Sequence, residues 1–136
     1  MLSPKKMKHR KWHKVAGTSG RVASRNQKIS FGSAGMKAMT SGWVNAREIE
    51  AVRRVLVRFT RKGGRIWARI FPYKPITAKG GEVGMGKGKG VVDHYVASVL
   101  PGMVLFEMDG ITMDKMKEAM KLGGHKLSVR TKFVTK

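Results

Sequence analysis

The stretch VVDHYVASVLPGMVLFEMDG, residues 91–110, contains two apolar runs that predict strands at the centre of the fold. Residues 91–100 and 103–108 are rich in valine and other residues that favour strands. Pro101-Gly102 lies between the runs and Asp109-Gly110 follows them, and both pairs are typical of turns. We therefore expect the two runs to pair with each other as an antiparallel hairpin.

Upstream of this hairpin, RIWARIF at residues 65–71 predicts another strand, because apolar and basic residues alternate along it. One face is apolar and suits a core: Ile66, Ala68 and Ile70. The other face suits either a binding surface or cover by the rest of the fold, and it carries Arg65, Trp67 and Arg69. Pro72 and Pro75 should then stop regular strand pairing.

Two helices are expected, each with a start signal and a glycine pair at its end. Asn45 and Glu48 have the spacing of a capping box, and Gly63-Gly64 ends this helix. Its apolar residues recur at helical intervals: Ile49, Val52, Leu56 and Phe59. Thr112 begins the second helix, which carries Met113, Met116 and Met120 on one side and ends at Gly123-Gly124.

Short strands are further expected at ISFGS, residues 29–33, and at SVRTKFV, residues 128–134. With Ile49, Leu56, Ile66, Ile70 and Phe133 in its core, the chain fits an α+β fold. In it, two helices pack on a mainly antiparallel sheet. Residues 29–136 then form a single α+β RNA-binding domain, preceded by a basic extended arm at residues 1–28.

Charge is the most unusual property of the chain. There are 29 Lys and Arg residues against 8 Asp and Glu residues, which gives a formal net charge of +21. Such a charge indicates a polyanionic partner, with nucleic acid first and an anionic membrane surface second. The chain has no cysteine, which excludes disulfides and thiolate metal sites, and its apolar stretches are too short to span a bilayer.

The arm at residues 1–28 contains nine of the basic residues and no acidic one, and it lacks apolar periodicity. We expect it to be poorly ordered in the free protein and to order against phosphate, although a solvated tail is the alternative. Trp12 favours the first interpretation, because an indole amid cations can stack on a base or ribose.

On the first helix, four arginines share one face and either contact RNA or form a solvated surface: Arg47, Arg54, Arg58 and Arg61. Glu50 can pair with Arg54 at the i,i+4 spacing. The candidate RNA contacts of the whole chain are Lys5, Lys6, Lys8, Arg10, Lys11, Trp12, Lys14, Arg47, Arg54, Arg58, Arg61, Arg65, Arg69, Arg130 and Lys132.

GMGKGKG, residues 84–90, predicts a long loop at the tip of a hairpin. If the run is extended, Met85, Lys87 and Lys89 point one way and the glycines leave the other side bare. If it is disordered alone, a partner must order it. A flexible connector is the remaining alternative. The run matches neither a P-loop nor a G-x-G-x-x-G fingerprint, which argues against small-nucleotide binding.

The sequence gives little support for a catalytic site or a metal site. His9 and His13 lack acidic or thiol co-ligands, and no nucleophile lies in a persuasive set with a base. We therefore expect neither an enzyme nor a cofactor.

The ordered set of pieces resembles one family, the large-subunit ribosomal protein numbered sixteen of bacteria and organelles. The pieces are MLSPKK (1–6), RKWHK (10–14), SFGS (30–33), AREIEAVRR (46–54), GRIWARIFPYKPIT (64–77), MGKGKG (85–90), PGMVLFEMDG (101–110) and KFVTK (132–136). They cover nearly the whole chain, and because they start at Met1 we expect no presequence.

The resemblance implies a non-enzymatic protein that binds large-subunit rRNA beside neighbouring ribosomal proteins and supports late subunit assembly. It implies that residues 1–14 and the loop come close to aminoacyl-site tRNA; the loop residues are Met85, Gly86, Lys87, Gly88, Lys89 and Gly90. We expect no self-oligomer, no membrane partner and a location on ribosomes of the cytoplasm or of an organelle matrix or stroma. A free cationic RNA-binding chaperone is the alternative.

The chain departs from the family pattern at four places. Gly84 stands where many bacterial members have an arginine that is hydroxylated in some of them. Tyr73 stands where aspartate is usual and Ser128 where proline is usual, and Gly80-Gly81 replace a more constrained pair.

Overall fold

The computed structural model describes residues 1–14 and 20–136, so residues 15–19 of the expected arm lie outside the described residues. Within the described residues the chain forms two helices and seven strands. In order they are β1 (Ala34–Ala38), β2 (Gly42–Asn45), α1 (Ala46–Thr60), β3 (Arg65–Ala68), β4 (Lys74–Ala78), β5 (Val91–Val99), β6 (Val104–Asp109), α2 (Met113–Gly124) and β7 (Thr131–Thr135). The α+β class expected from the sequence is confirmed.

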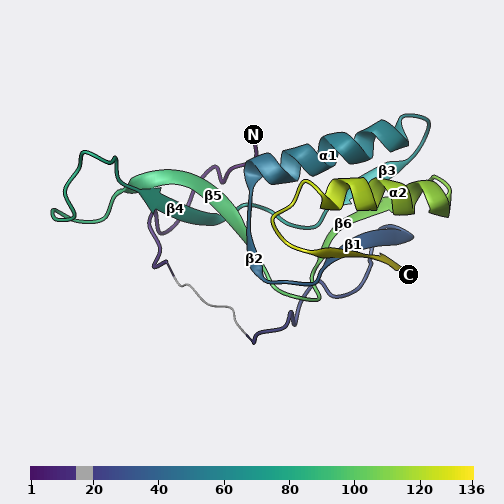
Figure 1. The fold of residues 1–136 in the computed structure, drawn as a ribbon, viewed down its shortest axis with the longest axis horizontal. Coiled ribbons are helices and arrows are strands. Elements are labelled where there is room, and N and C mark those ends of the chain that lie inside the picture. Colours follow the sequence, from purple (N-terminus) through teal and green to yellow (C-terminus); the bar gives the residue numbers. More distant parts are fainter. Residues whose placement is uncertain (15–19) are drawn as a thin grey trace.

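The strands form two antiparallel sheets, with the order β3-β6-β1-β7 in one and β2-β5-β4 in the other. In Figure 1 the helices α1 and α2 lie side by side over the first sheet, and the pair β4–β5 projects from the opposite end of the molecule. The two helices and the first sheet therefore form the body of the molecule, and the second sheet carries the projecting hairpin β4–β5.

The strand β5 connects the two parts because its halves have different partners. Residues Val96–Val99 pair with β2, whereas Val91–Val96 pair with β4. The two registers overlap at Val96 alone. Within the described residues, the outer half of β5 is therefore paired on one side only, as a two-stranded ribbon that carries the loop 79–90 at its end.

The prediction that residues 91–100 and 103–108 pair as a hairpin is wrong, although both strands exist. Around the Pro101-Gly102 turn, the Gly102 N–H donates to the Ala38 carbonyl and the Ala38 N–H donates to the Met103 carbonyl, at 2.7 and 2.8 Å. The turn thus pairs with the end of β1, and the chain changes sheet there.

The strand expected at residues 29–33 is also wrong, because these residues bind a side chain instead of another strand. The Glu107 carboxylate accepts the backbone N–H groups of Ser30, Phe31 and Gly32 at 3.1, 2.6 and 2.8 Å. Gly32 lies so close to β6 that a Cβ there would be 2.4 Å from the Met108 carbonyl oxygen. Regular pairing begins only at Ala34.

Further differences concern the residues around the two prolines. The strand β3 ends at Ala68, earlier than expected, and Pro75 lies inside β4. A proline fits there because β4 is an edge strand, paired only with β5.

The core lies between the helices and the first sheet and also includes Val44, Ala97 and Val99 of the second sheet. Helix α1 buries Ile49, Val52 and Leu56, and its Asn45–Glu48 capping box is present as predicted. Helix α2 buries Met116 and Met120, whereas Met113 is exposed. Ile70 is also buried, and Ile66 and Phe133 pack partly buried against the core. The amphipathic spacing therefore identified the buried face of α1, and that of α2 only in part, because Met113 lies outside it.

Candidate nucleic-acid interface

Acidic side chains are too few to pair with most cations, and some of them are bound within the fold. Glu48 caps α1 and also accepts the Ser128 N–H at 2.8 Å, and Asp109 accepts the Ser33 hydroxyl at 3.0 Å. Across residues 1–14 and 20–136, the ion pairs engage Arg53, Arg54 and Arg69, and Asp93 contacts the His94 ring at 2.7 Å. The remaining positive charge is available to a polyanion.

The arginine face of α1, defined as Arg47, Arg54, Arg58 and Arg61, is exposed along the length of the helix. Glu50 binds Arg53 through two hydrogen bonds of 2.9 and 2.6 Å and contacts Arg54 at 3.3 Å. The hydrogen bond from Arg53, with help from Arg54, lowers the pKa of Glu50 to about 2. The Arg54 side chain nevertheless stays 75% exposed, so the face keeps its charge toward solvent.

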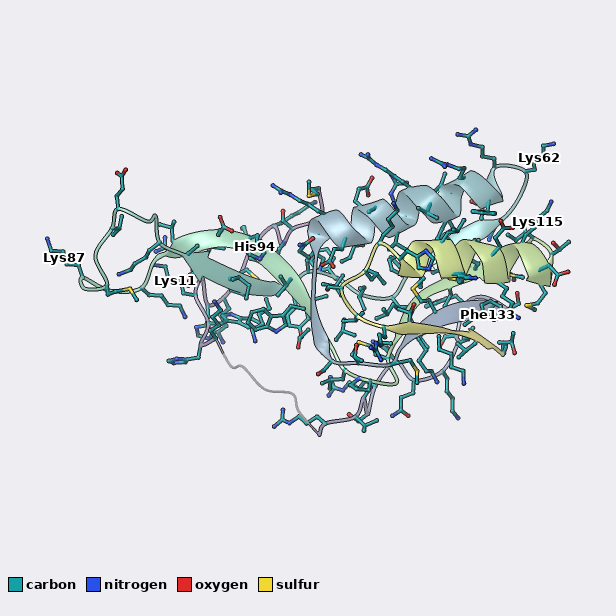
Figure 2. The ribbon with its side chains drawn as sticks, in the orientation of Figure 1. Lys11, Lys62, Lys87, His94, Lys115 and Phe133 are labelled. Carbon is teal, nitrogen blue, oxygen red and sulfur yellow. The ribbon has the colours of Figure 1, made fainter. Side chains whose placement is uncertain are left out.

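The loop 79–90 connects the antiparallel strands β4 and β5 and lies at the far end of the hairpin, where Figure 2 shows Lys87. It is not an extended strand, because Lys87 and Gly88 both have positive φ angles, 63° and 90°. The alternating side-chain directions considered for the run are therefore interrupted at its centre. Met85 is 95% exposed.

Lys79 holds the loop from inside, a role that the sequence pattern did not reveal. Its ammonium group donates to the carbonyls of Gly84, Met85 and Gly86, at 3.4, 3.3 and 2.8 Å. Together the loop residues surround a hollow of about 590 Å³. Lysines just after strands are common, so the sequence alone could not identify the carbonyls that this one binds.

The N-terminal arm contacts the loop through a reciprocal pair of hydrogen bonds. The Lys11 ammonium donates to the Lys89 carbonyl at 3.0 Å, and the Lys89 ammonium donates to the Trp12 carbonyl. The Trp12 ring lies 5.8 Å from the Tyr73 ring, and its indole N–H donates to the His9 carbonyl at 3.0 Å. The N-terminal arm and the loop 79–90, the two segments expected to meet nucleic acid, therefore lie side by side.

The other candidate arm residues, Lys5, Lys6, Lys8, Arg10 and Lys14, are exposed. So are Arg65 on β3 and Lys132 on the edge strand β7, with Arg130 just before it. Arg69 differs from these, because its guanidinium binds the buried Glu107 carboxylate. Its charge is engaged inside the protein, and Trp67 beside it is half-buried against Phe31.

The described residues contain no group of three or more His, Cys, Asp or Glu side chains that could hold a metal ion. None of the helices formed by these residues is long and apolar enough to cross a membrane.

Comparison with known proteins identifies the family of this basic chain. The family model "Ribosomal protein L16p/L10e" matches residues 4–134, nearly the whole chain. The chain belongs to the L16p/L10e family of ribosomal proteins. It is also 47% identical over 135 residues to "Large ribosomal subunit protein uL16c" of Cyanidium caldarium, an alignment that covers 99% of this chain and 95% of that protein.

Membership of the L16p/L10e family makes the chain a structural constituent of the large ribosomal subunit and not an enzyme. Its neighbours are rRNA and other ribosomal proteins, and it works on ribosomes of the cytoplasm or of an organelle. This membership also answers the question raised by the charge, because rRNA is a dense polyanion. A free RNA chaperone is no longer needed to explain it.

Proposed function

We propose that this L16p/L10e protein acts as a single copy in two ways. The arginine face of α1, the arm and the exposed cations near β3 and β7 bind large-subunit rRNA and support late assembly of the subunit. The loop 79–90 and the arm together reach aminoacyl-site tRNA near the peptidyl-transferase region. The second role rests on the likeness to the family together with the geometry of the hairpin.

The observation that carries the proposal is the reciprocal bonding between Lys11, Trp12 and Lys89. It joins the arm to the loop through Lys11 and Lys89, which are 78 positions apart in the chain. Because each lysine donates to a carbonyl of the other segment, the arm and the loop support each other in the absence of RNA. Such pre-ordering lowers the entropy cost of binding a mobile ligand.

The tip of the loop is suited to contact with phosphate. Lys87 is exposed at the end of the hairpin, far from the helices in Figure 2. Bare backbone at Gly86 and Gly88 flanks it, with nothing within 4 Å of where a Cβ would stand. A phosphate can therefore approach the ammonium group and the neighbouring backbone together.

The test compares Lys87→Ala/Lys89→Ala ribosomes with unchanged ribosomes in aminoacyl-site tRNA binding across a salt series. We expect the variant protein to enter the large subunit, because the loop buries little apolar surface. The tRNA affinity should fall, and the salt slope should decrease by roughly one unit per lost phosphate contact.

Two further variants separate the possible causes. Lys87→Ala alone keeps the bond between Lys89 and the arm, so it isolates the tip charge. Lys117→Ala/Lys121→Ala removes the same charge from exposed positions of α2 and should leave tRNA binding unchanged. Normal tRNA binding by the loop variant at every salt concentration would refute the tRNA role, whereas its loss from the subunit would make the loop an assembly anchor.

A further inference from the structure

Phe31 is an aromatic side chain held in a fixed position at the surface. Its residue is 58% exposed, although it lies next to the most deeply buried carboxylate of the fold. The hydrogen bonds from Ser30, Phe31 and Gly32 to Glu107 fix its backbone on both sides. An exposed phenylalanine gains little from such anchoring unless a partner covers it.

The ring itself is also supported by its neighbours. Trp67 stacks on it with ring centroids 6.1 Å apart and planes inclined by 19°. The Arg69 guanidinium lies 5.1 Å from the Phe31 centroid and is held in turn by Glu107 and by the Asn26 side chain. Ring, indole and guanidinium therefore form a platform whose orientation is set before anything binds.

A hollow of about 300 Å³ adjoins this platform and shares Arg69 with it. It is lined by Ser24, Asn26, Gln27, Lys28, Ser30 and Arg69. The Gln27 amide nitrogen donates to the Ala23 carbonyl, and the Asn26 amide oxygen accepts from Arg69. The Gln27 oxygen and the Asn26 nitrogen remain as one acceptor and one donor, the groups that the edge of a nucleobase needs.

The chemistry of the hollow favours RNA over a protein segment as its occupant. Its lining is polar and includes the exposed Lys28, and it contains no carboxylate. Glu107, which binds the lining residue Arg69, is neutralised by that guanidinium and by the backbone. An apolar peptide would leave these polar groups unpaired, whereas a nucleotide offers a flat ring, a polar edge and a phosphate.

We propose that Phe31 and the adjoining hollow bind one unpaired nucleotide of RNA. Its base stacks on Phe31, its edge bonds to Asn26 and Gln27, and its phosphate lies near Lys28. The proposal rests on the rRNA-binding role given above and adds a defined site to it. The arginine face of α1 and the loop 79–90 take no part in this site.

The first experiment measures the contribution of a single base with purified protein. Two RNA hairpins are compared, one fully paired and one with a single bulged 2-aminopurine, whose fluorescence falls when it stacks on an aromatic ring. The unchanged protein should prefer the bulged hairpin by about 5- to 150-fold, the usual range for one stacked base. Phe31→Ala should abolish this preference and the quenching, and Phe31→Tyr should restore both.

Matched controls separate stacking from charge and from misfolding. Phe71→Ala removes another exposed phenylalanine, 44% exposed, but leaves Phe31 and its contacts with Trp67 and Arg69 in place, and it should keep the preference. Raising the salt should weaken binding to both hairpins and lower their ratio by no more than the one phosphate near Lys28 accounts for, because stacking itself releases no counterions. A thermal melt confirms that each variant is folded. An equal preference in Phe31→Ala and unchanged protein overturns the proposal.

The second experiment identifies the source of the nucleotide in assembled large subunits. Unpaired bases are probed chemically in subunits that contain Phe31→Ala or the unchanged protein at equal stoichiometry. A gain of reactivity at one or two rRNA bases supports rRNA as the source, and loss of quenching without any such gain supports another RNA. A photo-crosslink from position 31 to a ribosomal protein, with neither RNA effect, overturns the site while leaving rRNA binding elsewhere intact. Absence of both variant and unchanged protein from the subunit would refute the broader proposed function instead.

Discussion

Glu107 is the residue on which the local geometry most depends. It is the one charged side chain that is fully buried among residues 1–14 and 20–136, and its exposed fraction is 0%. Burial alone raises the pKa of this carboxyl group. The N–H groups of Gly32, Ser30 and Phe31, together with Arg69, outweigh that effect and hold the pKa below its usual range.

Replacing Glu107 by glutamine should therefore destabilise the protein strongly. The amide keeps the volume but removes the charge, so Arg69 is left without its carboxylate and the three N–H groups lose a strong acceptor. We expect the free energy of unfolding to fall by about 3–5 kcal/mol, as for one partner of a buried ion pair. Urea denaturation measures it, with the exposed pair of Glu50 as a control in Glu50→Gln. A difference no larger than that of the control would contradict the assignment.

The lowered pKa of Glu107 also predicts a pH dependence. A carboxyl group whose pKa is lower in the folded state contributes stability above its unfolded pKa, about 4.3, and loses it as the pH falls through the folded pKa. The stability gap between unchanged protein and Glu107→Gln should therefore narrow below about pH 4.3. Unfolding curves between neutral and acidic pH test this. A gap that stays constant into the acid-unfolding region would show that the group does not titrate as described.

At the scale of elements, features that depend on residues close in sequence could be predicted, whereas pairing between distant strands could not. The capping box and the apolar face of α1 depend on residues three or four positions apart, and both are present. The strand β5 pairs instead with β2 and β4, and the turn that follows it bonds to Ala38, more than 60 positions earlier in the chain. The same turn signal fits a hairpin and a change of sheet, so sequence could not separate them.

Leu56 tests the buried face of α1. Its side chain is fully buried between the helices and the sheet, so Leu56→Ala should lower the free energy of unfolding by about 2–5 kcal/mol. The neighbouring Val57 is exposed, and Val57→Ala should change it by no more than about 0.5 kcal/mol. Thermal melts of both variants give the comparison, and equal melting temperatures would mean that the helix face is wrongly assigned.

Lys79 tests the internal support of the loop 79–90. Lys79→Met keeps the aliphatic stem but removes the donor for the Gly84, Met85 and Gly86 carbonyls. We expect faster amide exchange in the loop with little change in global stability, because few apolar contacts are lost. Lys87→Met serves as the control for loss of a loop charge. Identical exchange rates in Lys79→Met and unchanged protein would show that the lysine does not order the loop.

At the scale of the whole molecule, composition pointed to the class of partner, whereas positions within the site needed the fold. The formal net charge of +21 already indicated a polyanion. Sequence could not show that Arg69 is engaged by Glu107, nor that Lys89 binds the arm, since these partners lie 38 and 77 positions apart. The hollow beside Phe31 likewise combines residues whose types alone carry no signal.

The charge distribution predicts how binding of the free protein to large-subunit rRNA depends on salt. Arg54→Ala/Arg58→Ala removes two charges from the arginine face of α1, and the slope of log affinity against log salt should fall by about two units. The Lys117→Ala/Lys121→Ala variant removes two charges from α2 and should change the slope less. Filter binding at several salt concentrations measures both slopes, and equal slopes would mean that α1 has no special share in the interface.

The single overlap of partners at Val96 has a mechanical consequence. Beyond this residue the β4–β5 ribbon is a cantilever, fixed at one end and free to twist, because two strands resist torsion less than a wider sheet does. Displacement grows with distance from the fixed end and is largest at Lys87. The arm acts as a brace from the side, since it reaches the ribbon near its tip through Lys11 and Trp12 and contacts Tyr73 near its base. The stiffness of the tip therefore depends on the arm as much as on the hairpin. Any event that pulls the arm away allows the loop to move more freely.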